Sequence, residues 1–466
     1  MTKTTILGVT IILCTLLLIN RTSEFKYVWK NNYTFVHSNG MFPVREILLY
    51  DIERKMSPES KPDNEYRMRN GHLKINPETT KNSPSSWVDN WIEVTSNLHI
   101  YSAYLDNRPL VPHHPVIRIF GWSTLEVTKL QNMRCLTKVK YLGQQADLRI
   151  FPVTKVVKIG LTSKSFLCSI PFGYHKKILS VSLSFSSFQN SKWINVHHIP
   201  NSMKPEAQGR IAVCTPPFYN YINDTYLLAQ FLAFHHVVGI DHFTFYDFQT
   251  NQKIRDLIHR LSENGFPIVL LPWSAFWKVS IPLSHYREGG HAHLTQIQDC
   301  LYRHMHHYEY VIDLDMDEFL VPYENKTITQ ILSNFSSCTV CGAYRFRQSI
   351  FCLKFPSMTD AHNDFQSLMT LEKVFGKPLG LKNWPDYLKY IVRPETVVYG
   401  GIHKVWEMLP NKSEINVDRG ILIHHYRNIV VCNFEKEKNQ LIEDHTIPEL
   451  YGKQMLQLMH KWKNIL

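Results

Sequence analysis

The sequence predicts an α/β protein in which a small β-rich domain precedes a larger domain with a mostly parallel sheet. From about residue 210 onward, apolar runs with strand character alternate with helical patterns, which is typical of a parallel sheet. Between residues 87 and 205, short β-branched and aromatic runs such as VIRIFGW and ILSVSLSFSSF alternate with turn residues. A chain of 466 residues has room for two or three such domains.

The N-terminal part predicts a membrane anchor and a spacer. Residues 4–20, TTILGVTIILCTLLLIN, carry no charge and are close to the shortest length that spans a membrane. They form either a signal anchor or a cleaved signal peptide, and the lack of a small-residue cleavage site after them favours the anchor. Residues 21–86 are polar and rich in Pro, Ser and Asn, as a flexible stem would be. We therefore expect a tail at 1–3, an anchor at 4–20, a stem at 21–86 and folded domains at 87–205 and 206–460.

Glycosylation sequons and cysteines predict a secretory compartment. With an N-terminal anchor, the sequons place the C-terminal body in the lumen, and the whole would be a single-pass type II membrane protein. Nine cysteines are present, and the eight beyond Cys14 can form disulfides in an oxidising lumen, although the sequence does not choose the pairs. The expected glycosylation sites are Asn32, Asn223, Asn325, Asn334 and Asn411.

The charge balance is basic but has no nucleic-acid signature. The net charge is +11 and the isoelectric point is about 9.0. Lys and Arg are spread along the chain without a basic block, so the sequence speaks against nucleic-acid binding. An anionic small substrate explains the charge, and so does a lumenal protein with no special partner.

The elements of the second domain follow from its periodicity, starting at about residue 206. The order is strand (RIAVCTPPF), amphipathic helix (YINDTYLLAQFLAFHHVVG), strand (IDHFTFYDF), helix (NQKIRDLIHRLSENG) and strand (FPIVLLPW). Apolar residues spaced by three and four then predict a helix in HAHLTQIQDCLYRHMHHYEY. This helix runs directly into the stretch YEYVIDLDMDEFLVP, in which a buried strand ends in a group of acids.

That last strand carries a cluster of acids. Alternation along a strand places Asp313, Asp315 and Asp317 on one face, and carboxylates this close need a cation among them. Ligands of open α/β sheets bind at the carboxyl ends of strands, and paired Asp carboxylates there suit Mg²⁺ or Mn²⁺ completed by substrate phosphates. A dehalogenase-type phosphatase would need Thr or Val where the chain has Phe319.

Several ordered blocks resemble glycosyltransferase family 92. The resemblance covers about residues 87–427 and implies a GT-A type nucleotide-sugar-binding domain and a Golgi galactosyltransferase activity. It implies UDP-galactose as donor, Mn²⁺ (or Mg²⁺) as cofactor, inversion at the anomeric carbon, a β-1,4 linkage, and a galactose- or fucose-bearing glycan of a glycoprotein or glycolipid as acceptor. The blocks are AVCTPPFYN, HHVVGIDHFTFYDF, HLTQIQDCLYRHMHHYEYVIDLDMDEFLVP, KYIVRPETV and GIHKV.

The resemblance assigns provisional roles at the metal and donor. Asp315 and Asp317 would hold the metal, with either His403 or one of His424 and His425 as a third ligand. Arg427 would contact phosphate. Asp247, at the end of a strand, either contacts the uridine or caps the next helix.

The catalytic base and the acceptor contacts are less constrained. Inversion needs a carboxylate that takes the acceptor proton, and the candidates are Glu318, Glu372 and Asp386. Trp384, close to Asp386, offers a sugar-stacking surface. The alternatives are a transferase for another UDP-sugar and a non-catalytic, glycan-binding member of the fold.

Two further motifs are expected to be structural. His304, His306 and His307 lack the spacing of a zinc-binding helix and are expected on the surface. Cys338 and Cys341 have no second CxxC pair at a zinc-site spacing, so we expect them to be disulfide-bonded.

Overall fold

The structure is a computed structural model of the chain. It describes residues 90–140, 146–171, 177–185, 191–199, 208–218, 224–273, 291–357, 368–378, 388–428 and 432–466. The predicted tail, anchor and stem lie outside these described residues. Within them, no helix has both the length and the apolar character needed to cross a bilayer.

The first eight strands form one sheet that closes on itself. β8 pairs with β7 and also with β2, and the interior is filled by apolar side chains such as Leu105, Ile119 and Phe166. The bounds are β1 (Ile92–Thr95), β2 (Leu98–Asp106), β3 (Val116–Ser123), α2 (Val127–Leu130), β4 (Arg134–Val139), β5 (Asp147–Lys158), β6 (Ser163–Ser169), β7 (Ile178–Ser184) and β8 (Ile194–His198). The predicted bounds of this domain, 87–205, stay a prediction.

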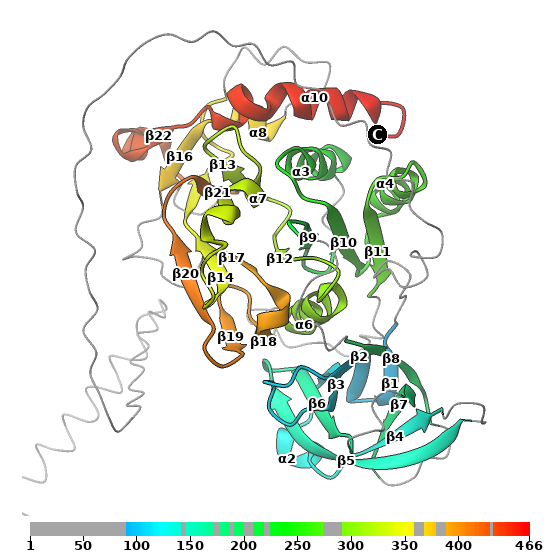
Figure 1. The fold of residues 1–466 in the computed structure, drawn as a ribbon. Coiled ribbons are helices and arrows are strands. Elements are labelled where there is room, and N and C mark those ends of the chain that lie inside the picture. Colours follow the sequence, from blue (N-terminus) through cyan, green and yellow to red (C-terminus); the bar gives the residue numbers. More distant parts are fainter. Residues whose placement is uncertain are drawn as a thin grey trace, which may run out of the picture. The chain divides into compact units, whose positions relative to one another are not determined.

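The next strands build a seven-stranded mixed sheet (Figure 1). Its order is β11-β10-β9-β12-β17-β14-β20, and the four strands from β11 to β12 are parallel. The chain therefore winds outward from β9 to β11 and then returns to place β12 on the other side of β9. The bounds are β9 (Ile211–Cys214), β10 (His242–Asp247), β11 (Ile268–Pro272), β12 (Tyr310–Asp313), β14 (Cys341–Phe346), β17 (Lys389–Val392) and β20 (Ser413–Val417).

Helices cover both faces of this sheet (Figure 1). α3 (Thr225–Val237), α4 (Gln252–Glu263) and α10 (Gly452–Lys461) pack on the face to which β9 contributes Ile211 and Val213. α6 (His293–His304) packs on the opposite face with Ala212 and Cys214. α3 is buried over most of its surface, contrary to the amphipathic helix expected, because α10 lies against its outer side.

Two smaller sheets complete the described part of the chain. A five-stranded sheet has the order β13-β21-β15-β16-β22, and β18 pairs with β19 in a two-stranded sheet. The bounds are β13 (Glu318–Pro322), α7 (Ile328–Leu332), β15 (Gln348–Phe351), α8 (Met369–Glu372), β16 (Phe375–Pro378), β18 (Val397–Gly400), β19 (Val405–Met408), β21 (Ile421–Tyr426), α9 (Phe434–Glu437) and β22 (Ile442–Glu443).

The eight cysteines beyond Cys14 form four disulfides, as an oxidising compartment would allow. Cys214–Cys300 ties β9 to α6, and Cys135–Cys168 ties β4 to β6. The other two are Cys338–Cys341 and Cys352–Cys432. The expected disulfide at Cys338 and Cys341 is confirmed, and these two residues pair with each other.

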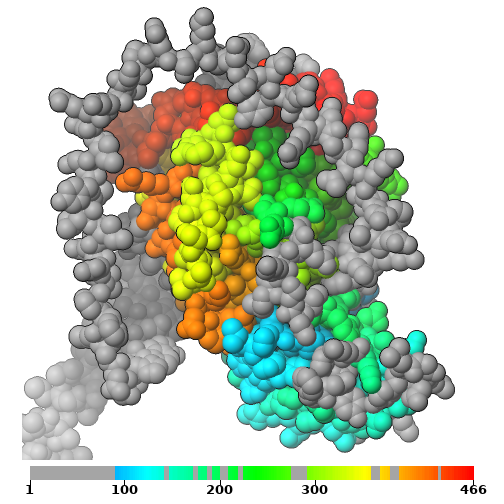
Figure 2. Space-filling view, viewed as in Figure 1, coloured from blue at the N-terminus to red at the C-terminus, as the bar shows by residue number. Residues whose placement is uncertain are grey.

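A buried ion cluster joins the closed sheet to the rest of the protein. Asp106 accepts hydrogen bonds from Arg108 and Arg118, each at 2.9 Å. Arg108 also donates to the main-chain oxygens of Glu395 and Val397, and Arg118 donates to the Tyr399 hydroxyl. Figure 2 shows the matching surface, where the blue start of the described chain adjoins the orange residues around 400.

Candidate active site

A cavity opens at the carboxyl ends of β9 and β12, where the winding of the sheet reverses. Its volume is about 410 Å³, within the usual range for small-molecule sites of about 300–1,000 Å³. Residues 215–218, which follow β9, line one side, and residues 315–317, which follow β12, line another. Such a reversal point is where open α/β sheets bind nucleotide ligands.

The acids lie on a turn, so the expectation that Asp313, Asp315 and Asp317 share one face of an extended chain is wrong. β12 ends at Asp313 and β13 begins at Glu318. The Asp315 N–H donates to Oε2 of Glu318 at 3.0 Å, and the Glu318 N–H donates to the Asp315 carbonyl at 3.0 Å. Asp315 and Asp317 therefore line the cavity, whereas Asp313 accepts hydrogen bonds from His293 and Gln296 of α6.

Lys389 is the cation that the acidic cluster required. This residue begins β17, and its Nζ lies 3.1 Å from Oδ2 of Asp315 and 3.1 Å from Oε2 of Glu318. Burial works to raise the pKa of the Asp315 carboxyl, but the charge and hydrogen bond of Lys389, together with nearby histidines, outweigh it and hold that pKa at about 2. Burial raises the pKa of the Glu318 carboxyl, against the pull of Lys389. Asp315 is thus ionised and held in place.

His425 stands beside Asp317 at the end of β21. Strand pairing places His425 opposite Glu318, and its Nε2 lies 3.3 Å from Oδ2 of Asp317. Its Nδ1 faces Gln348, with which it hydrogen-bonds, and Oε1 of Glu318 at 3.6 Å. Nε2 is therefore the ring nitrogen of His425 that lies on the side of the cavity acids.

The cavity is lined by ligand types that hard divalent cations prefer. Asp315 and Asp317 expose 41% and 34% of their side chains toward the cavity, and with the imidazole of His425 they offer oxygen and nitrogen ligands that suit Mn²⁺ or Mg²⁺. Arg427 lines the same cavity, with its Nη1 3.4 Å from Nε2 of His425. A cation and a guanidinium next to one another suit a diphosphate.

The two other candidate third ligands lie elsewhere. His424 points to the opposite side of β21, where it is buried and contacts the Tyr323 hydroxyl at 2.8 Å and Asp444 at 3.3 Å. His403 lines a second cavity, and burial together with the Lys389 charge lowers the pKa of its imidazole to about 4. Neither is among the described lining of the acidic cavity.

Asp247 is held by the helix that follows it. Its carboxylate accepts two hydrogen bonds from Arg255, both at 2.9 Å, and one from the Thr250 N–H. The cap of α4 is Asn251, so Asp247 is not the helix cap. Asp247 lies at the carboxyl end of β10, and its role toward a uridine stays a prediction.

The remaining candidates fall into two groups. Glu372 ends α8 and is outside the described lining of the cavity. Trp384 and Asp386, together with Asn32 and Asn223, lie outside the described residues. Of the other sequons, Asn325, Asn334 and Asn411 are all exposed.

The expected surface histidines are mostly buried. His304 and His306 are 0% and 3% exposed, because α6 is covered on both sides; only His307 is partly exposed. His304 lies near Cys214 and Cys300 in an arrangement that resembles a metal site. The two cysteines are disulfide-bonded, so no thiolate is available there.

A comparison with models of protein families identifies the family of this chain. The model for glycosyltransferase family 92 matches residues 209–454, from the start of β9 to the start of α10. The chain belongs to glycosyltransferase family 92. The resemblance found in the sequence is thereby confirmed.

Comparisons with other proteins add only distant likenesses. TarS 1–349 of S. aureus in complex with UDP is similar at 10% identity and a TM-score of 0.22, over 40% of this chain and 47% of that one. The chain thus spans about half of the TarS structure. Glucosyl-3-phosphoglycerate synthase from Mycobacterium tuberculosis in complex with phosphoglyceric acid is similar at 12% identity and a TM-score of 0.25, over 53% and 79%. HddC from Yersinia pseudotuberculosis is similar at 11% identity and a TM-score of 0.23, over 46% of this chain and 93% of that one. No curated protein matches the sequence.

Proposed function

We propose that this family 92 enzyme transfers galactose from UDP-galactose to a glycan, with the help of a divalent cation and with inversion at the anomeric carbon. The observation that carries the proposal is the group Asp315, Asp317 and His425 at the reversal point of the sheet, in a cavity that also contains Arg427. The choice of galactose and of a β-1,4 linkage rests on the family resemblance of the ordered sequence blocks.

Asp315, Asp317 and His425 are the proposed holders of Mn²⁺ or Mg²⁺, which when bound would neutralise the developing charge of the UDP leaving group. Lys389 keeps the Asp315 carboxylate in position, and Glu318 keeps both Lys389 and the Asp315 N–H in position. Arg427 is placed to donate hydrogen bonds to a phosphate oxygen. Asp247 remains the proposed uridine contact.

The geometry favours a positioning role for Glu318 over that of a catalytic base. Its side chain is 3% exposed and paired with Lys389. A base must reach the acceptor hydroxyl within hydrogen-bond distance, and a carboxylate held this way faces the protein interior. Asp386 is therefore our proposed base, with Trp384 as a sugar contact.

We further propose a single-pass type II protein of the Golgi membrane with a lumenal catalytic part. The apolar segment 4–20 supports an anchor, and four disulfides support an oxidising compartment. The exposure of Asn325, Asn334 and Asn411 makes these sequons accessible to glycosylation.

UDP release by the purified full chain tests the proposal. UDP-galactose, UDP-glucose and UDP-GlcNAc would each be given with galactose- and fucose-bearing N-glycans, with Mn²⁺ or with chelator. We expect turnover with UDP-galactose that chelator abolishes and that falls at least about 100-fold in Asp315→Ala and Asp317→Ala, because each variant removes a metal ligand.

Asp147→Ala, which removes a half-exposed acid in the closed sheet, is the matched control and should keep full activity. Turnover that survives chelator would contradict the metal site. Preference for another UDP-sugar would change the donor, and glycan binding without turnover would make the protein a non-catalytic member of the family.

A further inference from the structure

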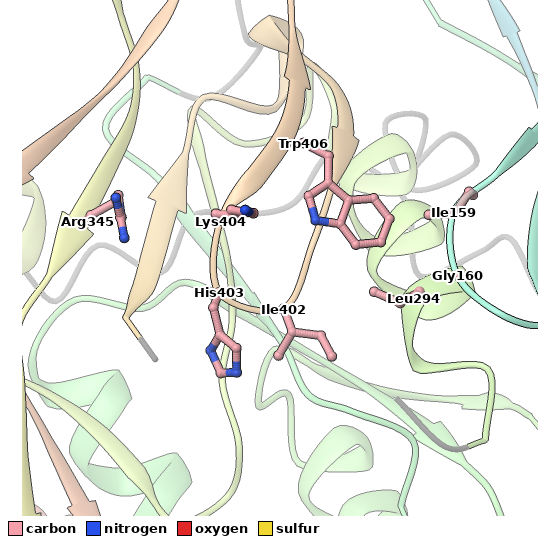
Figure 3. A pocket seen from close by; sticks show the side chains of 8 residues that line it. All are labelled: Ile159, Gly160, Leu294, Arg345, Ile402, His403, Lys404 and Trp406. Atoms are coloured by element: carbon pink, nitrogen blue, oxygen red, sulfur yellow. The ribbon is translucent and has the colours of Figure 1, made fainter. Parts of the chain in front are cut away.

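A second cavity of about 430 Å³ lies between the closed sheet and the catalytic part of the chain. Figure 3 shows its described lining: Ile159 and Gly160 come from the closed sheet, Leu294 from α6, and the remaining residues from β14, from β19 and from the segment between β18 and β19. Most of this lining is carbon, with Trp406 as its largest aromatic side chain.

Trp406 exposes an unusually large apolar surface for its position. It is 43% exposed, on the two-stranded sheet of β18 and β19, and Figure 3 shows its indole directed toward Leu294 and Gly160. Gly401 allows this placement: a Cβ added at Gly401 would lie 2.4 Å from Nε1 of Trp406. An indole ring that is half-exposed at the edge of a cavity is suited to stacking against a ligand ring.

Residues 401–404 connect the second cavity to the acidic site. Residues 401–404 turn between β18 and β19, with the Gly401 N–H donating to the Lys404 carbonyl at 2.9 Å. The Gly401 N–H also donates to the Tyr390 hydroxyl at 3.1 Å. Tyr390 is the neighbour of Lys389, which holds Asp315, and the charges of Lys389 and Asp315 act on His403 at the end of the same turn.

The closed sheet supplies the opposite wall, so the cavity needs both parts of the chain. A Cβ added at Gly160 would lie 2.6 Å from Cδ1 of Leu294, which means that the β5–β6 turn packs directly on α6. Thr295 of α6 donates to the Gly121 carbonyl of β3 at 3.0 Å and fixes the helix there. The wall formed by Ile159 and Gly160 is therefore held in place relative to Trp406.

We propose that this second cavity binds a neutral pyranose ring of the acceptor glycan, stacked on Trp406. The inference rests on the proposed function, because it names the acceptor side of the same transfer. One face of a pyranose such as galactose presents C–H groups, which are attracted to the negative face of an indole, while its hydroxyls need polar partners. His403, on which the Asp315 charge acts, and Lys404 supply such partners.

Acceptor kinetics of the full chain test this assignment. With UDP-galactose and Mn²⁺ saturating, Trp406→Ala should raise the KM for the acceptor glycan about 10-fold or more, with kcat changed less than about 3-fold, since a ring contact of this kind serves binding. Trp406→Phe keeps an aromatic face and should restore most of the affinity. Gly401→Ala keeps the indole but displaces it, and should also raise the KM.

Two controls separate a binding role from a loss of structure. Trp193→Ala removes a half-buried tryptophan of the closed sheet that stacks under Lys138 and is outside the cavity lining, and it should leave the acceptor KM unchanged. The affinity of Trp406→Ala for UDP with Mn²⁺ should equal that of the wild type.

The outcomes distinguish this inference from the proposed function. If the wild type transfers galactose and Trp406→Ala has the wild-type acceptor KM, the proposal that the second cavity binds the acceptor is refuted, whereas the proposed galactosyl transfer is not. A changed KM for UDP-galactose alone would also refute it. If the wild type transfers nothing, saturation-transfer NMR with methyl galactoside decides: binding that disappears in Trp406→Ala supports the cavity without the proposed activity, and binding that persists refutes it.

Discussion

Two clusters in this protein pair carboxylates with cations but differ in their exposure to solvent. In the first, Asp106 lies between Arg108 and Arg118, and all three side chains are at most 1% exposed. In the second, Lys389 is 1% exposed, but its partner Asp315 is 41% exposed and faces a cavity. One cluster is closed, and the other is open on its acidic side.

The exposure of the carboxylates distinguishes a structural charge cluster from a functional one. In the closed cluster the two arginines outweigh the effect of burial and hold the pKa of Asp106 well below its usual range, and the arginines also donate to main-chain oxygens and to tyrosine hydroxyls. In the open cluster the carboxylate oxygens of Asp315 and Asp317 still have room for a partner from the cavity. Satisfaction of every polar group marks a structural role, and exposed acids beside a fixed cation mark a binding site.

The largest expected effect comes from breaking the closed cluster. Asp106→Asn leaves two buried arginines without their carboxylate, and we expect a loss of about 3–5 kcal/mol in the free energy of unfolding. Urea unfolding of wild type and variant measures it.

The matched control is Asp147→Asn, which breaks a half-exposed pair with Arg149 and should cost less than about 1 kcal/mol. Equal losses in the two variants would mean that burial does not distinguish these pairs.

A smaller effect should depend on pH at Glu395, which borders the closed cluster. Burial raises the pKa of the Glu395 carboxyl to about 7, above the value of about 4.3 in the unfolded chain. Between these two values the folded state binds more protons, so stability falls as the pH rises, by up to about 4 kcal/mol.

Glu395→Gln should remove this dependence of stability on pH. In thermal unfolding, the stability of the variant relative to the wild type should therefore rise from pH 5 to pH 8. Glu435→Gln, at a residue 77% exposed, should keep the wild-type slope. A Glu395→Gln variant with an unchanged slope would show that Glu395 ionises normally in the folded protein.

Much of the sheet could be predicted because its signals are local. The alternation of apolar runs and helical stripes from about residue 210 onward corresponds to β9, α3, β10, α4, β11, α6 and β12. The acids at the carboxyl end of β12 were likewise visible in the sequence. The break between Asp313 and Glu318 was not, because a strand with alternating acids and a strand followed by an acidic turn share one pattern.

The partners of the acids could not be found because they come from distant strands. Lys389 lies 74 residues from Asp315 in sequence, and only the pairing of β12 with β17 brings them together. The register of β13 with β21 likewise selects His425 over His424 and His403. A charged residue at the start of an apolar strand, as in KYIVRP, is the one local signal that pointed to Lys389.

The smallest expected change in stability comes from removing Lys389 from the open cluster. Lys389→Gln removes the cation of the open cluster, and we expect a loss of about 2 kcal/mol in chelator, less than in the closed cluster because Asp315 is partly exposed to water. Saturating Mn²⁺ should restore part of this stability, since a bound cation takes over the charge that Lys389 supplied. Thermal unfolding with and without Mn²⁺ measures the gain, which should be larger in Lys389→Gln than in the wild type. Asp106→Asn keeps the open cluster intact and should gain as much from Mn²⁺ as the wild type does; an equal gain in Lys389→Gln and Asp106→Asn would mean that Lys389 and the metal do not share the charge of Asp315.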